Sequence, residues 1–210
     1  MLVLQMETNK IKVIFFDIGG VLLSDGWDRH SRKKAALNFG FDYDEMDQLH
    51  QIHFPIYEIG SYSLSAYLDK TVFYTKRDFS KEEFQTFIMA QSQELPHTLT
   101  WLKVWNEKHK FRIFSINNEG KELHDYRTEQ FRLHELFEGF ITSGYVGLRK
   151  PDPKIYQLAL NIVQAKPEQC IYFDDRDYLV KAARDMGINA FQHRSFENTK
   201  HILEQLQINH

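Results

Sequence analysis

The chain has 210 residues, of which 42% are hydrophobic and 26% are charged, values typical of a soluble globular protein and not of a disordered one. Its 26 basic and 29 acidic residues give a formal net charge of −3, which argues against nucleic acid as a partner. The single cysteine, Cys170, cannot form an internal disulfide, and no apolar run reaches the ~18 residues that a membrane-spanning helix needs.

The N-terminal part of the chain leads into a predicted strand. The first stretch, MLVLQMETNK, lacks the basic start, long apolar centre and cleavage site of a secretory signal, so we expect a cytoplasmic protein with no membrane partner. Residues 11–16 (IKVIFF) are apolar and β-branched, which predicts a strand buried on both faces. Asp17 follows this strand directly.

The next segment, residues 25–95, has a different texture. It contains no convincing strand, but its amphipathic runs predict helices over 27–39, 44–54, 64–74 and 81–94. Ser80 and Glu83 have the spacing of a capping box, which marks a helix start. Most of its many aromatic residues should pack a small core, and Trp27 and Phe54 are candidates to contact a ligand. We therefore expect a helical insertion after the first strand.

From residue 96 onward, strands and helices alternate. Strand-like runs occur at 111–116, 139–142, 170–173 and 188–191, and helix-like runs at 99–109, 121–136, 153–163, 178–186 and 198–206. This alternation predicts βαβ units and an α/β fold with a parallel sheet. We expect one domain formed by residues 1–24 and 96–210, and a second formed by residues 25–95.

Polar side chains follow several of the predicted strands, at the edge of a parallel sheet where ligands bind. They are Asp17 after the first strand, Ser115 at the end of the second, and Asp174 and Asp175 at the end of the fourth, with Lys150 in a loop nearby. Crowded carboxylates need a cation or a raised pKa, and oxygen ligands without His or Cys suit Mg²⁺. A carboxylate can also act as a nucleophile, while a hydroxyl and a lysine hold a phosphoryl group.

Four stretches, taken in order, resemble the motifs of the haloacid dehalogenase-like (HAD) hydrolase superfamily. They are FFDIGGVLL, FSINN, LRKPDPKIYQLAL and IYFDDRDYLVKAARDMGI, and the resemblance covers essentially the whole chain. It implies a Rossmann-like doubly wound parallel sheet with an inserted α-helical cap that closes over the substrate. It also implies that Asp17 is the nucleophile and that Ser115 and Lys150 bind the phosphoryl group. The implied ligands of Mg²⁺ are Asp17, Gly19 (through its carbonyl), Asp174 and Asp175.

The sequence departs from the family pattern at two positions. In the second motif Ile116 stands where relatives have Asn, and Asn117 comes one residue later; we keep Asn117 as a candidate phosphate-binding residue. Many family phosphatases have a second Asp, the general acid and base, where this chain has Gly19. General acid–base catalysis contributes ~10²–10⁴-fold, so its loss slows a phosphatase without silencing it. Asp25 and His30 are candidates to supply the proton.

Three functions are compatible with these motifs. The first is a Mg²⁺-dependent phosphatase of a small phosphorylated metabolite, a monomer or homodimer that forms an aspartyl-phosphate on Asp17. The second is a 2-haloacid dehalogenase, a branch that uses no metal and typically lacks the acidic pair at Asp174 and Asp175. The third is a non-catalytic module that binds a phospho-ligand, which Gly19 favours. The retained acidic pair and nucleophile lead us to predict the phosphatase.

Overall fold

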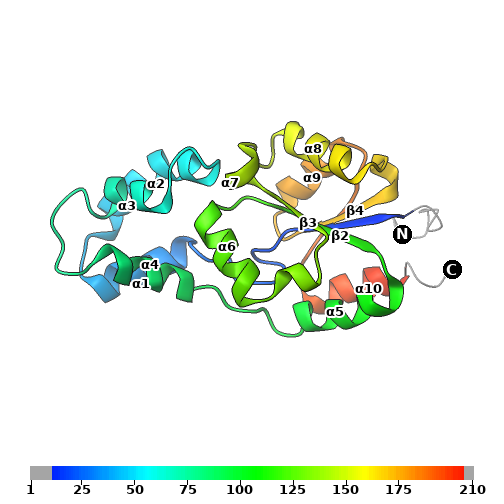
Figure 1. The fold of residues 1–210 in the computed structure, drawn as a ribbon, viewed down its shortest axis with the longest axis horizontal. Coiled ribbons are helices and arrows are strands. Elements are labelled where there is room, and N and C mark those ends of the chain that lie inside the picture. The colour runs from blue at the N-terminus through cyan, green and yellow to red at the C-terminus, as the bar shows by residue number, and fades with distance from the viewer. Residues whose placement is uncertain (1–10, 206–210) are drawn as a thin grey trace.

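The computed structural model describes residues 11–205, which contain a five-stranded parallel sheet in the order β3-β2-β1-β4-β5 (Figure 1). The strands are β1 (Val13–Phe16), β2 (Arg112–Asn117), β3 (Gly139–Thr142), β4 (Cys170–Asp174) and β5 (Asn189–Gln192). The chain adds β2 and β3 on one side of β1 and then returns to add β4 and β5 on the other side. The order in which strands are added therefore reverses between β1 and β4, although all five strands are parallel. The predicted α/β, Rossmann-like sheet is confirmed, and ligands bind at such a reversal.

Helices cover both faces of the sheet (Figure 1). One face packs against α5 (Thr98–His109) and α10 (Phe196–Gln205), and the other against α8 (Pro153–Val163) and α9 (Asp177–Asp185). The alternating side chains of β1 enter both hydrophobic clusters, and all four of its residues are fully buried. This two-sided burial explains the uninterrupted apolar run in the sequence.

One predicted helix of this part is broken. The sequence predicts a helix over 121–136, but α6 (Lys121–Gln130) ends earlier and a 3-10 turn, η3 (Leu133–Glu135), follows it. The break lies at Arg132, whose φ of 50° is left-handed. This backbone turn places Leu133 in the hydrophobic cluster between the sheet and α5 and α10. Tertiary packing therefore overrides the local helical pattern there. Two further short elements, α7 (Ser143–Val146) and η4 (Pro167–Gln169), precede α8 and β4.

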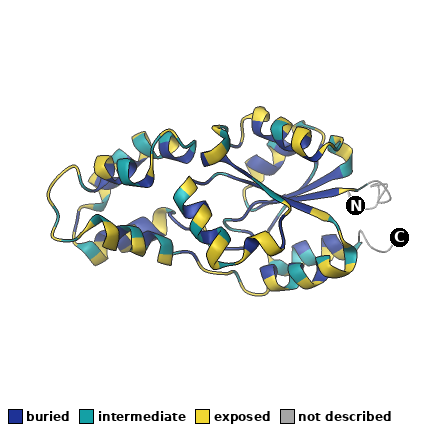
Figure 2. Cartoon of the chain, in the orientation of Figure 1, coloured by how far each residue is buried: buried dark blue, intermediate teal, exposed yellow. Residues whose placement is uncertain are grey.

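Four of the five helices that lie between β1 and β2 in the chain form a group beside the sheet (Figure 1). They are α1 (Arg29–Phe39), α2 (Tyr43–Glu58), α3 (Leu64–Thr71) and α4 (Lys81–Ala90), called the cap helices below. Each begins at an Asp or Ser whose side chain accepts a hydrogen bond from the first turn, and Ser80 and Glu83 form the predicted capping box. Their facing sides are buried and their outer sides exposed, as Figure 2 shows.

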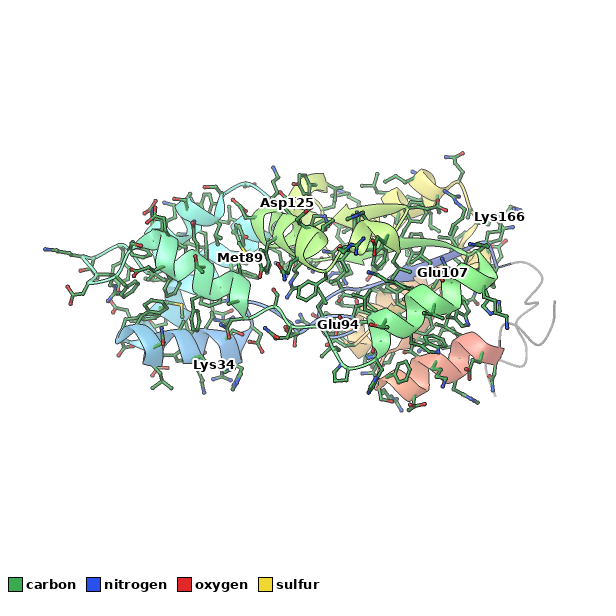
Figure 3. All side chains as sticks on the ribbon, turned by 60° about the horizontal axis from the view of Figure 1, so that its bottom comes forward. Lys34, Met89, Glu94, Glu107, Asp125 and Lys166 are labelled. Carbon is green, nitrogen blue, oxygen red and sulfur yellow. The ribbon has the colours of Figure 1, made fainter. Side chains whose placement is uncertain are left out.

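Two connecting segments, residues 17–28 and 91–97, join the cap helices to the sheet domain. They pair with each other, since the N–H of Ser24 donates to the carbonyl of Gln93 (2.8 Å) and that of Leu95 to Leu22 (2.9 Å). Glu94 marks the return segment in Figure 3, between Lys34 of α1 and Glu107 of α5. The division into domains 1–24 with 96–210 and 25–95 stays a prediction, and its residues 1–10 and 206–210 lie outside the described residues. No helix within 11–205 has the length and apolar character to span a membrane.

Close backbone contacts hold the end of α2 against the sheet side of the molecule. The Ser143 hydroxyl donates to the carbonyl of Glu58 (2.7 Å), and a Cβ added at Gly60 would lie 2.0 Å from the carbonyl oxygen of Gly144. Gly60 also has a φ of 77°, a conformation that L side chains rarely adopt. A side chain at position 60 would therefore separate α2 from α7.

Gly60→Ala tests this contact, and Gly40→Ala is its control. Gly40 has a similar φ of 66° but has no atom within 4 Å of an added Cβ. We expect Gly40→Ala to lower the free energy of unfolding by about 1 kcal/mol, because of the left-handed backbone alone. Gly60→Ala should cost about 1–3 kcal/mol more, because a backbone atom must move. Urea denaturation measures both losses, and equal losses would contradict the tight contact.

Candidate active site

The carboxyl ends of β1 and β4 bring three aspartates together. Phe16 pairs with Phe173 in the parallel register, so the residues that follow them, Asp17 and Asp174, lie side by side. One carboxylate oxygen from each of Asp17, Asp174 and Asp175 lies within 4.8 Å of the others. Asp17 and Asp174 are buried and Asp175 is half-buried. The structure thus brings together all three predicted carboxylates.

A buried lysine stands between two of these carboxylates. The Nζ of Lys150 lies 2.8 Å from Asp174 Oδ2, 3.1 Å from Asp17 Oδ1 and 2.9 Å from the Tyr172 hydroxyl, and the side chain is 1% exposed. The Tyr172 hydroxyl also donates to Asp174 Oδ2. Burial lowers the pKa of Lys150, but Asp17 and Asp174 outweigh it and raise the pKa, so the ammonium stays charged.

The carboxyls carry more negative charge than one lysine balances. Burial raises the pKa of Asp17 to about 7, with Lys150 opposing and Asp174 and Asp175 adding to the rise. Burial and Asp174 raise the pKa of Asp175 to about 6. Without another cation, the site therefore favours protonated carboxyls near neutral pH.

The site fits a divalent cation on two grounds. Asp175 Oδ1 is buried and has no hydrogen-bond partner among the described residues. Carboxylate oxygens without His or Cys are the donors that hard cations prefer. The absence of a side chain at Gly20 leaves room for Asp175, since a Cβ added at Gly20 would lie 2.7 Å from the Asp175 Cγ. Gly20 also has a φ of 71°. Asp17, Asp174 and Asp175 could together hold a metal ion, and the carbonyl of Gly19 stays a predicted ligand.

The second motif places Ser115 and Asn117 differently. Ser115 is fully buried on β2 and donates its hydroxyl proton to Asn117 Oδ1 (3.0 Å), as does Thr142 of β3 (3.2 Å). The amide of Asn117 is thereby oriented, and its Nδ2 has no partner within the described chain. Asn117 lines the cavity described below, whereas Ser115 lies behind it. Both phosphate-binding roles stay predictions.

Asn118 holds the backbone of Lys150, a role that sequence reasoning missed. Its Nδ2 donates to the Lys150 carbonyl (2.9 Å) and its Oδ1 accepts from the Lys150 N–H (2.8 Å). This double hydrogen bond fixes the loop that carries the lysine beside β2. The only sequence signal is the second Asn of FSINN, which does not identify a partner 32 residues away.

A buried arginine on α6 joins the site to both connecting segments. Arg127 is 1% exposed, and its Nη1 donates to Glu119 Oε1 (2.5 Å) just after the second motif. Its Nη2 donates to the Ser24 carbonyl (2.8 Å) and its Nε to the Ser92 hydroxyl (3.0 Å). A single side chain therefore ties both connecting segments to the end of β2.

A cavity of about 270 Å³ lies between the strand ends and the cap helices. Asp17, Asn117 and Lys150 line it from the sheet, and Trp27 and Phe54 line it from the cap side. The two aromatic residues predicted as ligand contacts are thus both placed at the cavity. A ligand bound at Asp17 would be enclosed by the cap helices.

The two candidate proton donors are placed differently. Asp25 lines the cavity, and its Oδ1 would lie 3.8 Å from a Cβ built on Gly19, the position of the missing acid. The Nη1 of Arg127 would lie at the same distance from that Cβ. His30 is exposed on α1 and is not part of the cavity wall. Of the two candidates, only Asp25 lines the cavity and lies close to position 19.

Comparison with known proteins agrees with this geometry. A family model described as haloacid dehalogenase-like hydrolase matches residues 11–187. Bifunctional epoxide hydrolase 2 of Rattus norvegicus is 41% identical over 56 residues, 27% of this chain and 10% of that protein, so the chain spans about a tenth of that relative's length. The glyceraldehyde 3-phosphate phosphatase of Pyrococcus furiosus is 25% identical over 199 residues (86% and 79%), and the fructose-1-phosphate phosphatase of Escherichia coli is 20% identical over 181 residues (84% and 93%).

Solved structures show the same fold. A HAD family enzyme from Bacteroides thetaiotaomicron has a TM-score of 0.80 and 20% identity, covering 92% of this chain and 98% of that one. Its complex with magnesium and inorganic phosphate has a TM-score of 0.74 and 19% identity, with coverage of 87% and 93%. The L-2-haloacid dehalogenase of Xanthobacter autotrophicus is more distant, with a TM-score of 0.61, 15% identity and coverage of 86% and 76%. With the family model spanning most of its length, this chain belongs to the haloacid dehalogenase-like hydrolase family.

Proposed function

We propose that the protein is a Mg²⁺-dependent phosphatase that hydrolyses a small phosphorylated metabolite through an aspartyl-phosphate on Asp17. One observation carries this proposal: Lys150 and the three aspartates converge at the edge of the sheet, beside the cavity under the cap helices. The phosphatase names of the Pyrococcus and Escherichia relatives and the magnesium–phosphate complex of the Bacteroides enzyme support it. A cytoplasmic location and a monomeric or homodimeric state stay predictions.

The proposed cofactor is Mg²⁺, held by Asp17, Asp174, Asp175 and the carbonyl of Gly19. The excess of carboxylates over Lys150 and the unpaired Asp175 Oδ1 support a cation there. When bound, Mg²⁺ would balance negative charge on the phosphoryl oxygens and on the aspartates. Added positive charge also lowers the pKa of Asp17, so the nucleophile is ionised at neutral pH.

The reaction follows from groups that the chain itself supplies. The Asp17 carboxylate attacks phosphorus, the ester bond breaks, and the alcohol leaves with a proton. Lys150 and the free amide of Asn117 stabilise charge on the transferring phosphoryl group, and Ser115 orients that amide. Water then hydrolyses the aspartyl-phosphate, which releases phosphate and restores Asp17.

The proton for the leaving alcohol comes, in this proposal, from Asp25. Its carboxyl occupies the neighbourhood that Gly19 leaves open, and Arg176 Nη2 lies 3.8 Å from its Oδ1. Asp25 belongs to the segment that leads into the cap helices, so its position is set by the same contacts that hold Ser24. In this proposal, the segment that leads into the cap helices supplies the general acid that the first motif lacks at Gly19.

The two alternatives differ from the phosphatase in measurable ways. A 2-haloacid dehalogenase displaces halide, which leaves as an anion and needs no metal, so the clustered Asp174 and Asp175 favour phosphate. A non-catalytic module would bind a phospho-ligand without turnover. Gly19 is the observation that favours this alternative.

The first test is hydrolysis of p-nitrophenyl phosphate with Mg²⁺. We expect chelation by EDTA to abolish turnover, and Asp17→Asn to lower it by at least about 10³-fold because the nucleophile is lost. Asp185→Asn, at an exposed site in α9, makes the same chemical change and should leave the rate unchanged. Turnover that survives EDTA or Asp17→Asn would exclude the mechanism. Phosphate binding without hydrolysis of any ester would favour the non-catalytic binding module. Release of halide from 2-chloropropionate would favour the dehalogenase.

A second test uses the pH dependence of stability in EDTA. Because the pKa of Asp17 is about 7 in the fold and its ordinary value is 3.8, its contribution to stability is full below pH 3.8 and is lost as the pH rises through 7. The unfolding free energy of the wild type minus that of Asp17→Asn should fall by about 2 kcal/mol between pH 5 and pH 8. Saturating Mg²⁺ should remove this fall. A difference that does not change with pH in EDTA would contradict the charge imbalance.

A third test addresses Asp25 through the leaving group. Asp25→Asn should lower kcat for alkyl phosphates by about 10²-fold, because an alkoxide needs a proton to leave. It should lower kcat for p-nitrophenyl phosphate by less than about tenfold, because nitrophenolate leaves as an anion. His30→Gln is the control and should change neither rate. Equal losses on both esters would remove Asp25 from proton transfer.

A further inference from the structure

His50 lines the cavity from the middle of α2, while Asp17 lines it from the sheet. The side chain is buried, and its ring lies against Phe54, with 4.5 Å between the ring centroids. Neither the motifs nor the mechanism above assigns it a role. Its hydrogen bonds define what it offers to a ligand.

A chain of polar contacts runs from Trp27 through Tyr67 to the His50 ring. Trp27 Nε1 lies 3.0 Å from the Tyr67 hydroxyl, which lies 2.8 Å from His50 Nδ1. An indole N–H can only donate, so the Tyr67 oxygen accepts from Trp27. In the arrangement that we assign, Tyr67 gives its own proton to Nδ1, so that the ring carries its hydrogen on Nε2.

The ring is also neutral. Burial, with a smaller effect of Arg32, lowers the pKa of His50 to about 3 against the opposing effect of Asp47. Because Nδ1 already accepts from Tyr67, protonation there would break the chain of hydrogen bonds. His50 therefore presents an uncharged N–H at every pH of practical interest.

Two charged residues near His50, Arg32 and Asp28, are already engaged in hydrogen bonds. Arg32 gives its Nε and Nη2 to Asp47 and its Nη1 to the carbonyl of Trp27. The Asp28 carboxylate caps α1 by accepting from the Ser31 N–H (2.7 Å). In contrast, His50 Nε2 has no hydrogen-bond partner among the described residues. Because His50 lines the cavity, this nitrogen is available to a ligand there.

We propose that His50 selects the substrate by donating a hydrogen bond from Nε2 to an oxygen on the organic part of the phosphate ester. This inference rests on the proposed phosphatase function. Trp27, Phe54 and Ile88 give the cavity apolar walls around this donor. The favoured substrates are phosphate esters of alcohols that carry a further hydroxyl or carbonyl oxygen. Tyr67 is a positioning residue, which acts by holding the His50 tautomer.

The specificity test compares esters that differ only in oxygen content, glycerol 3-phosphate against propyl phosphate and 4-hydroxyphenyl phosphate against phenyl phosphate. His50→Gln can place an N–H near the Nε2 position, whereas His50→Asn reaches only the Nδ1 position. We expect a wild-type preference in kcat/KM for the oxygenated member of at least one pair. His50→Gln should keep most of it, and His50→Asn should lower it by about tenfold with little change for the other member.

His53→Gln is the matched control, since His53 lies on the same helix but not on the cavity wall, and it should change no ratio. The same ester pairs are titrated calorimetrically against Asp17→Asn with and without the His50 changes, so that binding is measured without turnover. Absence of hydrolysis with the binding preference intact would reject the proposed function and keep this inference. The inference about His50 would be overturned if both His50 variants kept the wild-type preference, or if the wild type showed no preference.

The tautomer is tested separately by ¹⁵N NMR of the histidine side chains. We expect the His50 resonances of the wild type to show a proton on Nε2 from pH 5 to 8. Tyr67→Phe removes the donor to Nδ1 and should produce a mixture of tautomers together with a lower kcat/KM for the oxygenated ester. A merely structural Tyr67 would leave the tautomer unchanged. A wild-type ring protonated on Nδ1 would contradict the proposal.

Discussion

The placement of one buried ammonium organises this molecule. Lys150 is held between Asp17 and Asp174, and it reaches them because Asn118 fixes its backbone beside the end of β2. A charge in a protein interior must be paired, and removing a partner is costly. The lysine therefore ties its loop to the ends of β1 and β4. One ammonium does not balance three carboxylates, and this deficit of positive charge supports the proposed cation.

The cavity depends on a second set of contacts, those that attach the cap helices. Arg127 binds both connecting segments and Glu119, so these segments and the end of the second motif share one side chain. Gly60 and Gly144 allow the end of α2 to approach α7 at backbone distance. These contacts set α2 over the strand ends, and the Trp27–Tyr67–His50 chain holds the proposed donor of α2 in place. The proposed nucleophile, Asp17, and the proposed specificity residue, His50, therefore line the same cavity.

Local pattern predicted the parts that depend on neighbouring residues. The apolar run before Asp17 predicts a central strand because both faces of β1 are covered, and the capping box at Ser80 predicts a helix start because both partners lie within one turn. The prediction failed at Arg132, where a helical pattern continues but the backbone turns so that Leu133 can pack under the sheet. It also missed the Asn118 clamp, the Arg127 contacts and the Tyr172 hydroxyl. Each of these joins residues that are far apart in the chain, and no local spacing encodes their meeting.

The sequence alone determined the α/β class, the order of strands and helices and the family, since these follow from hydrophobic periodicity and from motifs of adjacent residues. It also indicated the carboxylates at 17, 174 and 175, because strand ends at one edge of a parallel sheet must lie near one another. Tertiary structure alone decided that Ser115 faces Asn117, that Asp25 and not His30 reaches the space beside Gly19, and that His50 opens into the cavity. The reason is physical: the direction of a side chain, the protonation of a buried group and the walls of a cavity depend on atoms brought together by packing, which periodicity along the chain does not record.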